Sequence, residues 1–256
     1  MNGLPDSDFF GEIEQVQAPW AGGTIHLPVF YYDVATLTVQ FLASIDRIRP
    51  LLPSPRMQPF RITPWHCVLA ISALAYRDCD IGPYNEVSIG IPMTLDEPSP
   101  VLTGILHPVP TVPKVYIRHL PVSTEIARRA GVEFAGYPKF VAKIVFEQDG
   151  NWIRCQLHQD DQHILTLSGR EGKLTRACRS RTQPVSVRRG YMLSSEWIVS
   201  ERLQFQSRGS KDAQLELGDH PIAQELQALK LDRMIGYQYA PQSQGILTPA
   251  NESFKV

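Results

Sequence analysis

The sequence GVEFAGYPKFVAK, residues 131–143, places Lys139 directly after a Tyr-Pro turn and at the head of an apolar strand. Proline fixes the backbone at such a turn, and the strand that follows would carry the lysine stem into apolar surroundings. A buried lysine costs free energy as a cation, so burial favours the neutral amine, which is a nucleophile. Lys139 is therefore the first candidate catalytic residue. The alternative is a lysine that flanks a β-hairpin with its ammonium in water.

A second segment, GPYNEV at residues 82–87, continues into another alternating strand. Strand periodicity puts Val87, Ile89 and Ile91 on one face and leaves Glu86 on the other. In an open sheet the glutamate face would meet solvent. In a closed barrel with a polar cavity the same face would line the site, which makes Glu86 the second candidate.

The pattern G-x-E-x-x-x-Y-P-K resembles the active-site segment of acetoacetate decarboxylases, with Lys139 at the position of the Schiff-base lysine. The segment at 82–92 resembles the family strand whose glutamate faces that lysine, so the resemblance implies this role for Glu86. Residues 37–55, with their Leu-Leu-Pro-x-Pro ending, match the family's early pattern. The resemblance covers residues 25–145, and the later half contributes no motif.

The chain departs from the family pattern at two positions. Family decarboxylases follow the reactive lysine with a second lysine, the cation credited with activating it, where this chain has Phe140. Adjacent strand side chains point to opposite faces, so residue 140 need not touch the amine, and a phenylalanine adds desolvation. The family also carries an arginine near the position of Val34, and its loss points to a keto acid other than acetoacetate.

Strand-like alternation dominates the rest of the chain. Predicted strands cover residues 36–41, 66–76, 86–91, 114–120, 140–146, 152–157 and 163–167. Capping and proline signals predict short helices at residues 44–52, 123–131 and 221–231. We therefore predict a mainly β (α+β) fold, a single antiparallel, closed or cone-like β-barrel with a few short peripheral helices, as the resemblance also implies.

The length of 256 residues fits one domain over residues 1–256, with 1–20 as an N-terminal arm and 172–189 as an exposed excursion. The net charge of −1, without a basic stripe, argues against nucleic acid as a partner. The start is polar and acidic, and no run approaches a membrane span, so we expect a cytoplasmic protein with no membrane partner.

The cysteines and histidines indicate neither a disulfide framework nor a metal site. The four cysteines form no C-x-x-C pair, so reduced thiols are expected. The seven histidines show no H-E-x-x-H or H-x-H pattern, although a site built from distant residues stays open. We expect no metal and no organic cofactor, because the lysine itself would supply the electron sink.

Four further residues are candidate substrate contacts, namely Tyr84, Arg118, Tyr137 and Phe140. Arginine is well shaped for a carboxylate, although Arg118 in the run VYIRHL could equally lie at the surface. Tyrosines near turns could wall a pocket, as could Trp65, or could be ordinary packing.

The function that these residues and the resemblance imply is decarboxylation of a β-keto acid through an iminium on Lys139, in a homo-oligomer. One alternative keeps the lysine and makes the chain an aldolase or dehydratase that acts on pyruvate-like 2-oxo acids. Another is a non-catalytic β-barrel that binds a small molecule, with Lys139 as a charge anchor.

Overall fold

The structure, a computed structural model, describes residues 9–11, 13–20, 23–99, 112–176, 179–208, 211–231 and 233–256. Twelve of its strands form a main sheet: β3 (Val29–Ser44), β4 (Met57–Pro59), β5 (His66–Cys79), β6 (Tyr84–Leu95), β7 (Lys114–Val122), β8 (Lys139–Val141), β12 (Thr175–Arg176), β13 (Arg179–Arg188), β14 (Tyr191–Ser194), β15 (Trp197–Ser207), β17 (Arg233–Leu247) and β18 (Asn251–Lys255).

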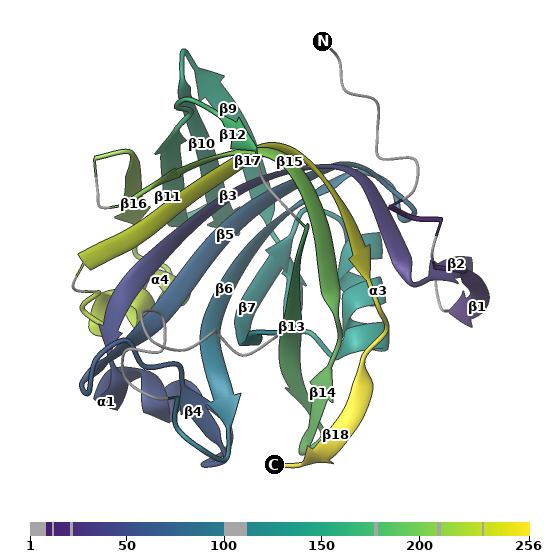
Figure 1. The fold of residues 1–256 in the computed structure, drawn as a ribbon, viewed down its shortest axis with the longest axis horizontal. Helices are drawn as coiled ribbons and strands as arrows, with labels where there is room; N and C mark the ends of the chain where they lie inside the picture. Colours follow the sequence, from purple (N-terminus) through teal and green to yellow (C-terminus); the bar gives the residue numbers. More distant parts are fainter. Residues whose placement is uncertain are drawn as a thin grey trace.

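The remaining elements lie around this sheet (Figure 1). A four-stranded sheet contains β9 (Lys143–Asp149), β10 (Trp152–Gln159), β11 (Gln162–Arg170) and β16 (Ala213–Leu217). A separate hairpin pairs β1 (Val16–Trp20) with β2 (Gly23–Leu27). The helices within the described residues are α1 (Ile45–Ile48), the 3-10 helix η1 (Arg49–Leu51), α3 (Glu125–Ala135) and α4 (Pro221–Ala228).

The main sheet follows the strand order β12-β15-β17-β3-β5-β6-β7-β13-β14-β18, with β4 paired to β6 and β8 paired to β7. Its strands are long and curve strongly across the molecule (Figure 1). Strand β15 pairs with β17 and also with the first residues of β13, so the pairing path returns toward its start.

The expectation of a mainly β fold is confirmed, but the expectation that its strands form a single antiparallel arrangement is wrong. The described strands form three sheets, and the main sheet is mixed, because β7 runs parallel to both β13 and β8. Parallel neighbours need a crossover connection, and α3 supplies it between β7 and β8. A strand, a capped helix and a strand in succession were the sequence signal for this unit.

The central strands of the main sheet have a hydrophobic core on each face. On one face, Val87 and Ile89 pack with residues of the four-stranded sheet and α4, in the largest hydrophobic cluster. On the other face, Tyr84 and Val122 pack with Ala127 and Ala130 of α3. Alternation along a strand therefore sends neighbouring side chains into two different cores, and Glu86 belongs to the face that α3 covers.

The sequence predicted most of these strands but misplaced two boundaries. The run 140–146 is divided at Ala142, with β8 in the main sheet and β9 paired to β10 in the four-stranded sheet. Helix α3 continues past Gly131 and ends at Gly136, which has a φ of 61° and forms the left-handed C-cap. Glycine at 136, not at 131, therefore terminates the helix.

The expectation for residues 172–189 is also corrected. Strand β13 begins with exposed residues, but Val185 and Ser186 are buried where it pairs with β7 and β14. Residues 175–176 and 179–188 therefore belong to β12 and β13 of the main sheet; residues 175–176 and 179–181 are exposed, but the described segment is not an excursion from the sheet. Of the expected arm at 1–20, residues 9–11 and 13–20 are described, and Phe9 packs against Phe30.

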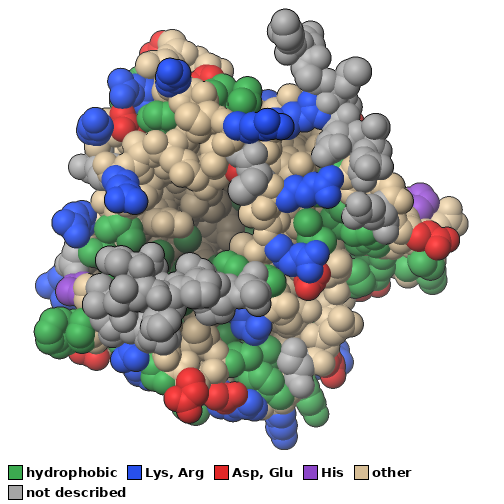
Figure 2. Space-filling model, viewed as in Figure 1, with side chains coloured by type: hydrophobic (Ala, Val, Ile, Leu, Met, Phe, Trp, Pro, Cys, Tyr) green, Lys and Arg blue, Asp and Glu red, His purple; other side chains and the backbone are tan. Residues whose placement is uncertain are grey.

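The surface and the thiols agree with the composition. The face in Figure 2 is hollowed near its centre, and its lysine and arginine side chains are scattered without a continuous basic patch. Within the described ranges, no helix is long and apolar enough to cross a membrane. Cys67, Cys79 and Cys155 are free and buried, and Cys178 lies outside the described residues.

The helix end at Gly136 generates a stability prediction. A Cβ built there would clash with Leu193 Cδ1, in a backbone conformation that alanine disfavours. Gly150 has nearly the same φ, 57°, with open space around it. We expect Gly150→Ala to lower the free energy of unfolding by about 1 kcal/mol.

For Gly136→Ala, overpacking should lower the free energy of unfolding by about 1–3 kcal/mol more than the loss expected for Gly150→Ala. Urea denaturation of the two variants measures the difference. Equal losses would contradict the close packing of Gly136 against β14.

Candidate active site

Lys139 lies at the first residue of β8, immediately after the C-terminal turn of α3. Its side chain is 4% exposed. The turn is held in place because the Tyr137 hydroxyl hydrogen-bonds Ser195, and Arg188 donates to the carbonyls of Val132 and Glu133 at the helix end. The Tyr-Pro turn therefore delivers the lysine into the space between α3 and the main sheet.

Gly131 makes room for the lysine stem. A Cβ at this position would lie 2.5 Å from both Cδ and Cε of Lys139 and 3.0 Å from Nζ. The lysine thus passes directly over the helix backbone where a side chain is missing. This contact explains a glycine in the interior of α3, where glycine otherwise weakens a helix.

Glu86 is the partner of Lys139. Lys139 Nζ lies 2.8 Å from Glu86 Oε2, and the glutamate side chain is 8% exposed. Glu86 stands on β6 opposite Val122 of β7, and Lys139 pairs with Leu120 on the far side of β7. The lysine therefore reaches across one strand to form a buried ion pair.

Three tyrosines surround this pair. The Tyr76 hydroxyl donates to Glu86 Oε1 at 3.2 Å, and the hydroxyls of Tyr31 and Tyr84 are 3.2 Å apart. Lys139 Nζ lies 5.4 Å from the centre of the Tyr84 ring, within the range of a cation–π contact. Burial raises the pKa of Tyr31, Tyr76 and Tyr84 well above the ordinary value, so all three remain neutral phenols.

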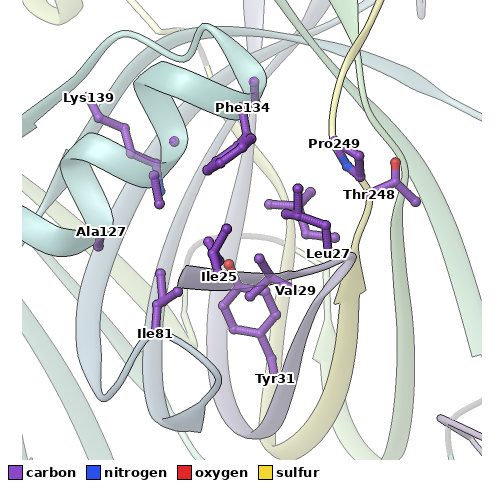
Figure 3. Close-up of a pocket in the computed structure, with 14 residues that line it drawn as sticks. Ile25, Leu27, Val29, Tyr31, Ile81, Ala127, Phe134, Lys139, Thr248 and Pro249 are labelled. Atoms are coloured by element: carbon purple, nitrogen blue, oxygen red, sulfur yellow. The ribbon is translucent and has the colours of Figure 1, made fainter. Parts of the chain in front are cut away.

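A small cavity of about 30 Å³ opens beside Lys139. Figure 3 shows Phe134 and Ala127 on α3 facing Ile25 and Leu27 across this space, with Thr248 to one side. The wall is formed by residues of β2, β3, α3 and β8, the turn after β5, and the end of β17 with the segment that follows it: Ile25, Leu27, Val29, Tyr31, Ile81, Ala127, Ala130, Gly131, Phe134, Ala135, Lys139, Leu247, Thr248 and Pro249.

Among the sequence candidates, the structure brings Lys139, Glu86 and Tyr84 together. Tyr137 is buried at the turn, where its hydroxyl bonds Ser195. Phe140 packs on the opposite core, as expected for adjacent residues of a strand. The site therefore has an aromatic and apolar setting instead of a second lysine.

Arg118 lies away from Lys139. Its guanidinium forms a salt bridge with Glu225 of α4 at 2.5 Å, and His119 Nε2 lies 2.8 Å from the same carboxylate. Burial alone would raise the pKa of Glu225, but hydrogen bonds from His119 and Arg118 outweigh it and lower this pKa to about 2. These groups tie α4 to β7.

Two other positions singled out in the sequence have a clear environment. Trp65 is 73% exposed and does not wall the pocket. Val34 is buried in the hydrophobic cluster that contains Tyr31 and Tyr76, so an aliphatic side chain occupies this position. Across the described residues, no group of three or more His, Cys, Asp or Glu could hold a metal ion.

Sequence reasoning missed Tyr31, Tyr76, Gly131 and the aliphatic wall. The wall comes from segments more than 100 residues apart in the chain, at 25–31 and 247–249, and neither segment carries a local motif. Only the glycine left a signal, because glycine inside a helical pattern suggests a packing reason.

The fold is β-rich and its main sheet is mixed. Between the crossover helix α3 and this sheet it encloses a lysine paired with a glutamate. These features define a class of proteins that hold a buried lysine amine next to a carboxylate. The sequence profile of the acetoacetate decarboxylase (ADC) family matches residues 14–243. The chain belongs to this family. No curated protein sequence matches it significantly.

Solved structures share the fold at low sequence identity. An acetoacetate decarboxylase from Legionella pneumophila subsp. pneumophila str. Philadelphia 1 is 12% identical with a TM-score of 0.72, covering 100% of this chain and 97% of its own. The enduracididine biosynthesis enzyme MppR, complexed with pyruvate, is 13% identical with a TM-score of 0.64. The match covers 88% of this chain and 89% of MppR. An acetoacetate decarboxylase-like enzyme from Sphingomonas wittichii RW1 is 14% identical with a TM-score of 0.54. The match covers 89% of this chain and 94% of that enzyme.

The buried pair generates a prediction for stability. Lys139→Met leaves an uncompensated carboxylate and Glu86→Gln an uncompensated ammonium, so each should lower the free energy of unfolding by about 3 kcal/mol. The double variant should lose less than the sum of the two by at least about 1 kcal/mol.

Urea denaturation of the four proteins at neutral pH measures this coupling. The exposed pair Glu125 and Arg128 on α3 is the matched control, and Glu125→Gln with Arg128→Met should show almost no coupling. Additive losses at Lys139 and Glu86 would contradict a direct interaction between them.

Proposed function

We propose that the chain is an enzyme that forms a Schiff base between Lys139 and a small keto acid, and that it decarboxylates a β-keto acid. The observation that supports this most directly is the buried 2.8 Å contact between Lys139 Nζ and Glu86 Oε2. A purely structural ion pair needs no cavity beside its amine, whereas this amine borders one. Family membership supports the same chemistry.

Glu86 provides the route to a neutral amine. Oε2 lies 2.8 Å from Nζ but accepts no hydrogen bond in this geometry, so the lysine terminus first turns toward it; one proton then moves from Nζ to Oε2, which converts the ammonium and carboxylate into an amine and a carboxylic acid. No net charge leaves the pair, so the low-polarity surroundings favour this exchange over loss of a lone proton. Tyr76 keeps the other oxygen of Glu86 hydrogen-bonded during the exchange.

The reaction then follows from the electron sink that an iminium supplies. The Nζ lone pair attacks the ketone carbon, and loss of water leaves the cationic iminium, with the Glu86 carboxylate beside it. The bond between the α-carbon and the carboxylate breaks, carbon dioxide departs, and the electron pair forms an enamine. Protonation at that carbon and addition of water release the ketone and regenerate Lys139.

Glu86 has two roles in this sequence. It passes the proton taken from Nζ to the oxygen that leaves as water, and after taking up a proton from solvent it protonates the α-carbon of the enamine, which is general acid–base catalysis. As a carboxylate near the iminium it also disfavours a second negative charge in the cavity, so it favours departure of the substrate carboxylate as neutral carbon dioxide.

A second candidate function uses the same imine. MppR is also described in complex with the condensation product of pyruvate and imidazole 4-carboxaldehyde, and its fold matches this chain with a TM-score of 0.62. An enamine formed from a pyruvate-like 2-oxo acid would attack an aldehyde instead of a proton. The chain would then act as an aldolase or dehydratase.

Borohydride trapping tests the imine directly. Incubation with acetoacetate, or with pyruvate, followed by borohydride should add a stable mass increment to the peptide that contains Lys139. Lys139→Ala should abolish the increment. Lys143→Ala, which removes an exposed lysine on β9, should retain it. An increment on Lys143 alone, or none with either acid, would favour a non-catalytic binding protein.

Product analysis separates the two reactions. Carbon dioxide release from acetoacetate supports decarboxylation, and a condensation product from pyruvate with an aldehyde supports the aldolase alternative. In either reaction Glu86→Gln should lower kcat by about 10²–10⁴-fold, the range of acid–base catalysis. Glu147→Gln, an exposed glutamate on β9, is the control and should leave kcat unchanged. Normal kcat in Glu86→Gln would remove Glu86 from the mechanism.

Association of identical chains, which the family resemblance implies, is part of this proposal. Light scattering of the purified protein measures it, and the mass of a single chain would contradict it.

A further inference from the structure

The wall around Lys139 has a chemical character that bears on the substrate. Of the fourteen described residues that line the cavity, Lys139 alone carries a charge, and none is an arginine, histidine, asparagine or glutamine. Ile25, Leu27, Val29 and Leu247 contribute aliphatic side chains. A site that recognises its ligand through a carboxylate would present a cation or several donors to it.

The polar groups that do reach the cavity already have partners. Lys139 is neutralised by Glu86, the Tyr31 hydroxyl bonds that of Tyr84, and Thr248 Oγ1 accepts from the backbone of Glu196. No cation among the lining residues is left over for a substrate carboxylate. Burial of apolar groups against the aliphatic wall is therefore the interaction that remains to bind a substrate.

We propose that the substrate of Lys139 is a 3-oxo acid with an apolar alkyl tail, and that the tail on this wall, not the carboxylate, provides recognition. This inference rests on the proposed imine at Lys139 and specifies its substrate. The tail lies between β2 and α3, against Leu27 and Phe134. Apart from the iminium itself, the wall offers the substrate carboxylate no cation, which matches a group that leaves as carbon dioxide.

The size of the cavity sets a limit on the tail. A volume of about 30 Å³ holds about one water molecule, so an alkyl chain enters only when the wall moves. Phe134 is half-buried and projects into the gap between α3 and β2, where Trp20 of the hairpin lies 6.2 Å from its ring centre (Figure 3). Phe134 and Leu27 are thus positioned to determine the longest tail that fits.

A homologous series tests the proposal. Lys139 is trapped with borohydride at sub-saturating acetoacetate, 3-oxohexanoate, 3-oxooctanoate or pyruvate, and the labelled peptide is quantified. Each methylene that reaches the wall should raise trapping about fourfold, the fold-change expected for burial of one such group. 2-Pentanone, which carries the tail of 3-oxohexanoate without its carboxylate, should be trapped about as well as that acid.

Two variants locate the tail. Phe134→Ala should shift the tail length that is trapped best toward longer tails. Leu27→Ala, on the opposite wall, should cause the same shift and serves as the second variant if Phe134→Ala folds poorly. Phe146→Ala removes a phenylalanine that packs on the other core and should leave the profile unchanged.

The outcomes separate this inference from the proposed function. Trapping of Lys139 that stays constant or falls as the tail lengthens, or that requires the carboxylate, overturns the apolar recognition while the imine stands. No trapping of Lys139 by any of these compounds overturns both.

Discussion

A buried ion pair across a β-strand is the constraint around which the rest of the structure is arranged. Lys139 and Glu86 are both almost inaccessible to solvent, and each would be costly without the other. The pair needs a helix to cover it, a glycine to make room for the lysine stem, and a tyrosine to satisfy the second carboxylate oxygen. Gly131 and Tyr76 meet the last two needs.

The sheet explains how one strand pattern can serve two cores. On β6, Val87 and Ile89 fill the large core shared with the four-stranded sheet, while Tyr84 and Glu86 face α3. Packing stability and chemistry are therefore carried by alternate residues of the same strand. The same division places Phe140 and Lys139 on opposite sides of β8, which is why an aromatic side chain next to the lysine is compatible with the site.

Local patterns predicted the strands and the two central residues, because alternation, caps and a short motif are written in adjacent positions. They did not predict the parallel pairing of β8 with β7, because alternation records which face is buried and not which way a partner runs. Gly131 was predicted to be a helix end because helix propensity takes no account of tertiary contacts, such as the lysine stem that passes over the backbone there. The cavity wall depends on segments near 25 and 247 that meet only in the folded chain.

Helix α3 both covers the cavity and connects β7 to β8, and this double duty limits how the segment can change in length. Each residue of an α-helix advances the rotation by about 100°. Inserting or deleting one residue between Glu125 and Ala135 would turn Gly131 away from the lysine, or Phe134 away from β2, without disturbing any strand. Surface turns elsewhere can vary in length. Helix α3, by contrast, must keep the number of residues that points Gly131 at the lysine and Phe134 at β2.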